Sequence, residues 1–254
     1  MKNQTLPTFS MLSMTAICAM YVVLMVVLQS VGVYLAARLY FGALDTESLL
    51  SQGSQNGTVV ACSVLFSAII LSGISLFGVA LKTKTWTKSK QFLGIRAFMP
   101  QQGCAALLLL LVLLFIIKHT TELLNKEPMA FMDALLDTHS LWPMVFAVVV
   151  VAPIYEELIF RGVIFEVLAR PKPRSDKPSR HSIIGAGIVS SALFALVHFQ
   201  YDWYGLLLIF VIALFFSYVK VRYGLLLAMF LHIVNNAITM VVYLLTTDYF
   251  AATL

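Results

Sequence analysis

Residues 142–168 read WPMVFAVVVVAPIYEELIFRGVIFEVL, an apolar run that contains Glu156, Glu157 and Arg161. A helix needs ~20 consecutive apolar residues to cross the ~30 Å hydrocarbon core of a bilayer, and this run is long enough. A charged side chain near the bilayer centre costs at least about 2.5 kcal/mol, so such groups are rare in spans and mark functional sites. The run therefore predicts both a membrane helix and a site within it.

The composition of the whole chain indicates an integral membrane protein. Of its 254 residues, 60% are hydrophobic and only 11% are charged, and the mean hydropathy is +0.91. Its long continuous apolar runs exclude barrel strands, which alternate in polarity over ~10 residues. We expect an all-α, polytopic membrane helix bundle of about seven spans, with six to eight as the range. The expected spans are residues 11–37, 58–81, 101–117, 142–168, 182–199, 205–219 and 223–245.

The charges between spans predict an orientation. Segment 82–100 carries five Lys and Arg residues and no acid, and segment 169–181 carries five against one acid, Asp176. Segment 118–141 is instead mainly acidic. By the positive-inside rule the N-terminus and the basic loops are cytoplasmic and the C-terminus is outside, which we expect in a bacterial plasma membrane. The net charge of +5 fits contact with lipid headgroups, and no nucleic-acid-binding pattern is present.

The charged residues of the quoted run have a helical spacing that separates their roles. Glu157 and Arg161 are four residues apart, so they share a face and can form an ion pair. Glu156 points about 100° away from Glu157 and is left for chemistry. A packing network without catalysis is the alternative for this short pattern. Glu166 is expected to extend to the interface, and Tyr201 to lie in an aromatic belt at the outer interface.

Two later apolar runs contain further polar groups. Phe194 precedes His198 by four residues, and His232 precedes Asn236 by four, so each pair shares a helical face. Asn235 could take the place of Asn236. Each pattern alone is typical of interhelical hydrogen bonding. Together, on separate spans, the three patterns favour a single intramembrane site.

The sequence lacks several signatures of intramembrane proteases. It has no HExxH and no Gly-x-Ser-Gly, and no paired aspartates fall within its spans. The patterns EExxxR, FxxxH and HxxxN, in this order, resemble the CPBP family of intramembrane proteases (CAAX prenyl endopeptidase type II and bacteriocin-processing, or Abi, family). We expect a CPBP/Abi-like catalytic core over 142–245, preceded by spans without an assigned motif over 1–141.

The resemblance implies an endopeptidase that cleaves a membrane-associated peptide or protein. Glu156 and His198 would activate a water molecule that attacks the peptide carbonyl. His232 and Asn236 would donate hydrogen bonds to the developing oxyanion. Four further residues are expected in supporting positions: Glu157, Arg161, Phe194 and Asn235.

The residues alone leave alternatives open. Glu156, His198 and His232 would also suit a single divalent metal such as zinc, with an open position for water; otherwise no cofactor is required. A non-catalytic immunity or partner-binding protein of the membrane is a second reading. A proton-coupled transporter with a Glu and His relay is a third, although no repeated halves are visible. The sequence sets no oligomeric state.

If both spans are straight helices, His198 and His232 lie at different depths in the membrane. At 1.5 Å per residue, His198 lies about 24 Å from Ser182, whereas His232 lies only about 14 Å from Tyr223. For these groups to meet, the fifth span must start later, tilt strongly, or be followed by a loop that dips into the bundle.

Overall fold

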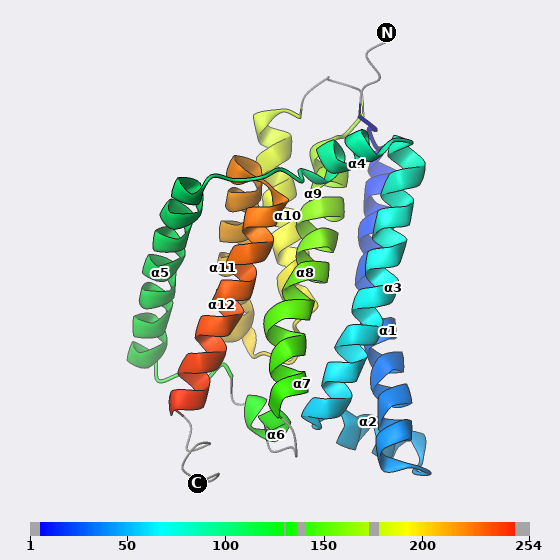
Figure 1. Cartoon of the computed structure of the whole chain (residues 1–254), viewed down its shortest axis with the longest axis vertical. Coiled ribbons are helices and arrows are strands. Elements are labelled where there is room, and N and C mark those ends of the chain that lie inside the picture. Colours follow the sequence, from blue (N-terminus) through cyan, green and yellow to red (C-terminus); the bar gives the residue numbers. More distant parts are fainter. Residues whose placement is uncertain (1–5, 130, 137–140, 173–177, 247–254) are drawn as a thin grey trace.

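The structure is a computed structural model that describes residues 6–129, 131–136, 141–172 and 178–246. Residues 173–177 of the basic segment 169–181 therefore lie outside the described residues. Within the described part, regular structure is helical apart from one isolated bridge between Phe9 and Pro171. The long helices lie side by side (Figure 1): α1 begins at the end that carries α4, and α12 ends at the opposite end, near α6.

In the described part of the chain, six helices are long and apolar enough to cross a membrane. They are α1 (Met11–Phe41), α3 (Gly57–Thr83), α5 (Pro100–Leu123), the continuous stretch Leu141–Ala169, α11 (Trp203–Tyr223) and α12 (Leu225–Thr246). A shorter apolar helix is α10 (Arg180–Leu196). Short helices at the ends of the bundle are α2 (Thr46–Ser54), α4 (Trp86–Leu93) and α6 (Met132–Leu136). The prediction of an all-α polytopic bundle is confirmed.

The third helix runs beyond its predicted end. The predicted span 101–117 stops before Lys118, but α5 continues to Leu123. Lys118 is exposed and forms an ion pair with Glu122 one turn later, at 3.7 Å. Charged residues that lie on an exposed helix surface do not end a helix, so apolar content alone underestimates its length.

Short polar residues set where several helices begin. Ser10, Asn56, Ser179 and Asp202 each accept a hydrogen bond from the backbone N–H three residues later. Each side chain thus satisfies one of the N–H groups that have no partner within the helix. These caps fix the starts of α1, α3, α10 and α11.

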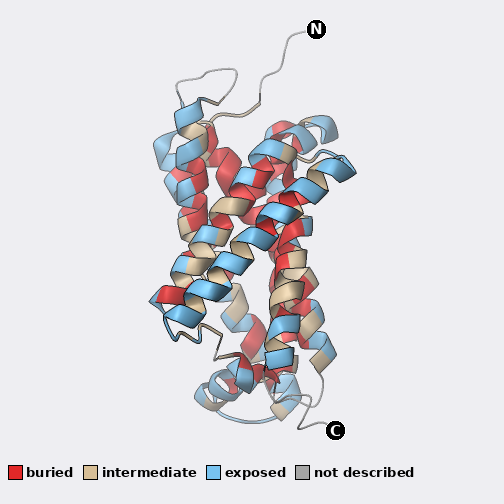
Figure 2. Cartoon of the chain, turned by 90° about the vertical axis from the view of Figure 1, so that its left-hand side faces the viewer, coloured by how far each residue is buried: buried red, intermediate tan, exposed pale blue. Residues whose placement is uncertain are grey.

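The stretch Leu141–Ala169 is the central helix of the bundle. In its most apolar window 56% of residues are buried, against 11% for α5. Figure 2 shows the same contrast, with buried residues inside the bundle and exposed residues on its outer faces. The stretch consists of α7 (Leu141–Phe146), the π-helix η1 (Ala147–Val151), α8 (Ala152–Glu157), the π-helix η2 (Leu158–Ile164) and α9 (Phe165–Ala169). Single π-turns inside helices are frequent at functional sites.

A proline leaves one carbonyl of the π-helix η1 free for another helix. The N–H of Ala152 donates to Ala147 O, five residues back. The next residue that would donate five residues back is Pro153, which has no N–H group for the oxygen of Val148. The side chain of Asn236 on α12 donates to this carbonyl instead, at 2.9 Å. The sequence of the central helix thus creates its own attachment point for α12.

The short helix α10 brings the second motif to the central helix. Its 17 residues span about 25 Å, less than the ~30 Å core. The ring of Phe194, near its end, contacts Phe160 of the central helix with centroids 5.1 Å apart. The connection 197–202 to α11, which contains His198, therefore begins beside the central helix.

Glu166 forms ion pairs that its local sequence did not predict. Its side chain is buried. Glu166 Oε1 contacts Lys220 Nζ, and Glu166 Oε2 lies 2.9 Å from Arg170 Nε. Lys220 lies on α11, 54 residues away in sequence, so the local sequence pattern gave no sign of this ion pair.

Candidate active site

The predicted ion pair between Glu157 and Arg161 is present and fully buried. Both side chains are 0% exposed, and Arg161 Nη1 lies 3.0 Å from Glu157 Oε1. The Nη1 group makes no aligned hydrogen bond there, so the contact is a charge pair. Arg161 Nη2 donates to the backbone oxygen of Ala213 at 3.1 Å, and the guanidinium lies 4.4 Å from the centre of the Phe194 ring. These contacts offset part of the cost of burying the charges.

One imidazole on α12 faces both carboxylates of the central helix. His232 Nδ1 lies 2.9 Å from Glu157 Oε1, and His232 Nε2 lies 3.9 Å from Glu156 Oε2. Glu156 and His232 are only 8% and 5% exposed. Arg161 pairs with Glu157 rather than with Glu156, as the helical spacing predicts. The structure thus brings the first and third motifs together.

The contact between Glu157 and His232 could not be predicted from local spacing, because it joins two separate helices. The same holds for α11, which carries none of the three motifs. Its Phe216 stacks on His232 with ring centroids 4.7 Å apart, and its Ala213 carbonyl accepts from Arg161. Both residues belong to a continuous apolar run, which gives no sequence signal for a site.

His198 reaches the cluster through Phe194. The Phe194 ring lies 4.6 Å from the His198 ring and 5.8 Å from the His232 ring, centroid to centroid. His198 Nδ1 lies 2.7 Å from the backbone oxygen of Phe194. A carbonyl only accepts, so Nδ1 carries the proton and Nε2 of the neutral ring is an acceptor. The helical spacing of FxxxH thus fixes the orientation of the imidazole.

The two asparagines have different surroundings. Asn235 is buried, and its Nδ2 donates to Asn236 Oδ1 at 3.0 Å. Asn236 is half-buried and donates one N–H to Val148 O. A side-chain amide has two N–H groups, so Asn236 has a second one for another acceptor. Asn235 supports Asn236 instead of replacing it.

Tyr201 lies near His198. Its ring is half-buried between Phe131, at 4.7 Å, and His198, at 6.3 Å between centroids. Its phenol can act as a hydrogen-bond donor.

The described residues do not fit the three-ligand metal site. Among them, no group of three or more His, Cys, Asp and Glu side chains is placed to hold a metal ion. Glu157 holds His232 at Nδ1, and the Phe194 carbonyl holds His198 at Nδ1, so each imidazole presents Nε2 to water or another ligand. We therefore derive no step that passes through a metal.

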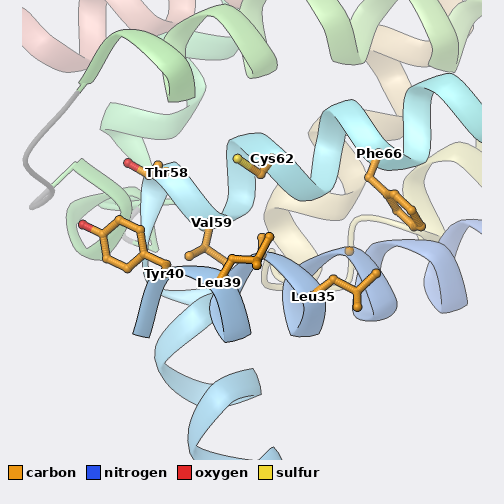
Figure 3. A pocket seen from close by; sticks show the side chains of 9 residues that line it. Leu35, Leu39, Tyr40, Thr58, Val59, Cys62 and Phe66 are labelled. Carbon is orange, nitrogen blue, oxygen red and sulfur yellow. The ribbon is translucent and has the colours of Figure 1, made fainter. Parts of the chain in front are cut away.

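An apolar groove between α1 and α3 is separate from this cluster. Its volume is about 450 Å³. Figure 3 shows Leu35, Leu39 and Phe66 along it. None of its lining residues is a histidine or a carboxylic acid, so the groove contains no general base.

A comparison with protein families matches this part of the chain. The family described as Type II CAAX prenyl endopeptidase Rce1-like matches residues 138–238. No curated protein and no solved structure matches the chain. The family match confirms the resemblance carried by EExxxR, FxxxH and HxxxN, and it contains all three motifs. Together with the six apolar helices, it supports a multi-pass membrane protein whose residues 138–238 are similar to CAAX-type endopeptidases.

Proposed function

We propose, from the match over residues 138–238, that this chain hydrolyses a peptide bond of a membrane-associated peptide or protein, with Glu156 and His198 activating water. The observation that carries the proposal is the convergence of Glu156, Glu157 and His232. The Phe194 ring contacts both His232 and His198. A general base and oriented hydrogen-bond donors in a water-poor site are what amide hydrolysis requires.

Glu156 is proposed as the general base. Its carboxylate is buried beside His232 but is not the partner of Arg161. His198 offers the free Nε2 as a second acceptor for the same water. The water oxygen would form a bond to the carbonyl carbon while its proton passes to Glu156. The C–N bond would then break as the same proton passes to the leaving amine.

His232 and Asn236 are proposed as oxyanion donors. An imidazolium at His232 would donate Nδ1–H to Glu157 and keep Nε2–H for the substrate oxygen. With Glu156 and Glu157 ionised and Arg161 charged, this imidazolium leaves the cluster with no net charge. Such neutrality matters where water does not screen the charges.

Replacement of Asn236 by alanine tests the oxyanion role. We expect kcat to fall about 10²- to 10³-fold, the usual effect of removing one such donor. Loss of the bond to Val148 should cost only about 0.6 kcal/mol in stability. Kinetics and thermal unfolding of the purified variant measure the two effects separately. Full activity with a lowered melting temperature would assign Asn236 to helix packing alone.

Chelation tests the metal-free mechanism. We expect the purified protein to retain its activity after incubation with EDTA or 1,10-phenanthroline, because the proposed steps use only side chains and water. Metal analysis of the same preparation is the matching measurement. Activity that disappears with the chelator and returns with zinc would favour Glu156, His198 and His232 as ligands instead.

The substrate class can be tested in cells. Membrane and secreted proteins are compared, by proteomics, between cells that contain the chain and cells that lack it. Substrates should accumulate uncut in the second case, and the purified protein should cut them at the same bond. A peptide that differs between the cells but is never cut by the purified protein would contradict the proposed activity.

A further inference from the structure

A second pocket lies at the end of the bundle that carries α4, away from the three motifs. It has a volume of about 430 Å³. Its walls come from α4, the connection from α4 to α5, α9, α10 and the end of α11. All these elements begin or end near the same end of the bundle (Figure 1). The ends of membrane helices lie in the headgroup layer of the bilayer.

The pocket is built around a buried ion cluster with an excess of positive charge. The Lys220 side chain is only 4% exposed and the Glu166 side chain 9%. Lys220 Nζ contacts Glu166 Oε1 and lies 3.9 Å from the centre of the Phe165 ring. The other oxygen of Glu166 is taken by Arg170 Nε at 2.9 Å. Two cations thus share one carboxylate.

Two further cations line the same pocket. Arg96 Nη2 donates to the backbone oxygen of Val221 at 3.0 Å, which holds the guanidinium at the pocket edge. Lys90 of α4 is exposed at the rim. Among the described lining residues the balance is therefore four cations against the single carboxylate of Glu166. Arg96 is exposed as Lys90 is, so an anion that enters the pocket meets a net positive charge, which favours its binding.

We propose that this pocket binds the phosphate headgroup of an anionic phospholipid. Arg96 and Arg170 supply guanidinium groups, which bind phosphate oxygens in pairs. Apolar side chains beside them, Ile95 and Ile183, suit the start of the glycerol and acyl region. Basic pockets between membrane helices bind anionic headgroups for these reasons. Free phosphate offers the same oxygens without the apolar part.

The test uses the full chain, purified and delipidated in a neutral detergent. Native mass spectrometry with added phosphatidylglycerol should show a bound lipid, whereas phosphatidylcholine at the same concentration should not bind. Inorganic phosphate should compete only weakly. Arg170→Gln and Arg96→Gln should each weaken phosphatidylglycerol binding about tenfold, the loss of about one charge-assisted hydrogen bond. Arg170→Lys, which keeps the charge, should restore part of the binding.

Lys82→Gln is the matched control, because Lys82 is an exposed cation of α3 near the same end of the bundle but does not line the pocket. Its binding should equal that of the wild type. Equal loss in all variants would mean general surface attraction and would overturn the proposal. Binding of inorganic phosphate without phosphatidylglycerol would overturn the lipid assignment. Circular dichroism and size-exclusion profiles confirm that each variant is folded. The readout is independent of proteolysis.

Discussion

Replacement of Glu156 by glutamine is expected to lower peptide-bond hydrolysis about 10²- to 10⁴-fold, the contribution of a positioned general base. Glutamine has the same shape but cannot accept the proton of the attacking water. The fold should survive, because Glu156 lies 3.9 Å from His232 Nε2, beyond a normal hydrogen bond, and does not neutralise Arg161. The measurement is the rate of cleavage of an identified substrate by wild-type and variant proteins in the same detergent.

Glu122→Gln is the matched control for this variant. Its side chain is 56% exposed on α5, and the same chemical change there should leave the rate unaltered. Both variants should reach the membrane in wild-type amounts and unfold within about 4 °C of the wild type. Substantial proteolysis by the Glu156→Gln protein would remove Glu156 from the mechanism.

Replacement of Arg161 by methionine should have the largest effect on stability. It leaves Glu157 buried with one cationic partner fewer, and breaking a buried pair in this way costs about 3–5 kcal/mol. It also removes the hydrogen bond to the Ala213 carbonyl and the stacking on Phe194. We expect the melting temperature in detergent to fall by about 10 °C.

A double variant separates charge from packing. Glu157→Gln combined with Arg161→Met removes both charges, so it should recover part of the stability lost in Arg161→Met alone. Lys118→Met, which breaks the exposed pair with Glu122, should change the stability by less than about 1 kcal/mol. If Arg161→Met unfolds at the wild-type temperature, the buried pair contributes nothing to the fold.

The sequence predicted contacts along one helix well. The pair between Glu157 and Arg161 and the packing of Phe194 on His198 both follow from a spacing of four residues. The helical bundle followed from long apolar runs, since the bilayer admits few other structures. These features depend on neighbours within one or two helical turns, which a single sequence contains.

Contacts between helices could not be read in this way. The hydrogen bond from His232 to Glu157 joins positions 75 residues apart, and Phe216 reaches the site from a run that looks uniformly apolar. The ion pair of Glu166 was not predicted for the same reason, since Lys220 approaches it from α11. The position of His198 depends on where α10 ends. The last turn of α10 is as apolar as the turns before it, so the sequence did not predict this end.

The bond between Asn236 and the carbonyl freed by Pro153 limits how the chain can change in length. It fixes α12 lengthwise against the central helix, with His232 one turn before Asn236 and level with the two glutamates. Inserting or deleting one residue between Pro153 and Glu157, or between His232 and Asn236, would rotate one group by about 100° and shift it by about 1.5 Å relative to the other. Insertions and deletions are therefore expected to be tolerated in the connections between helices and not within these two segments.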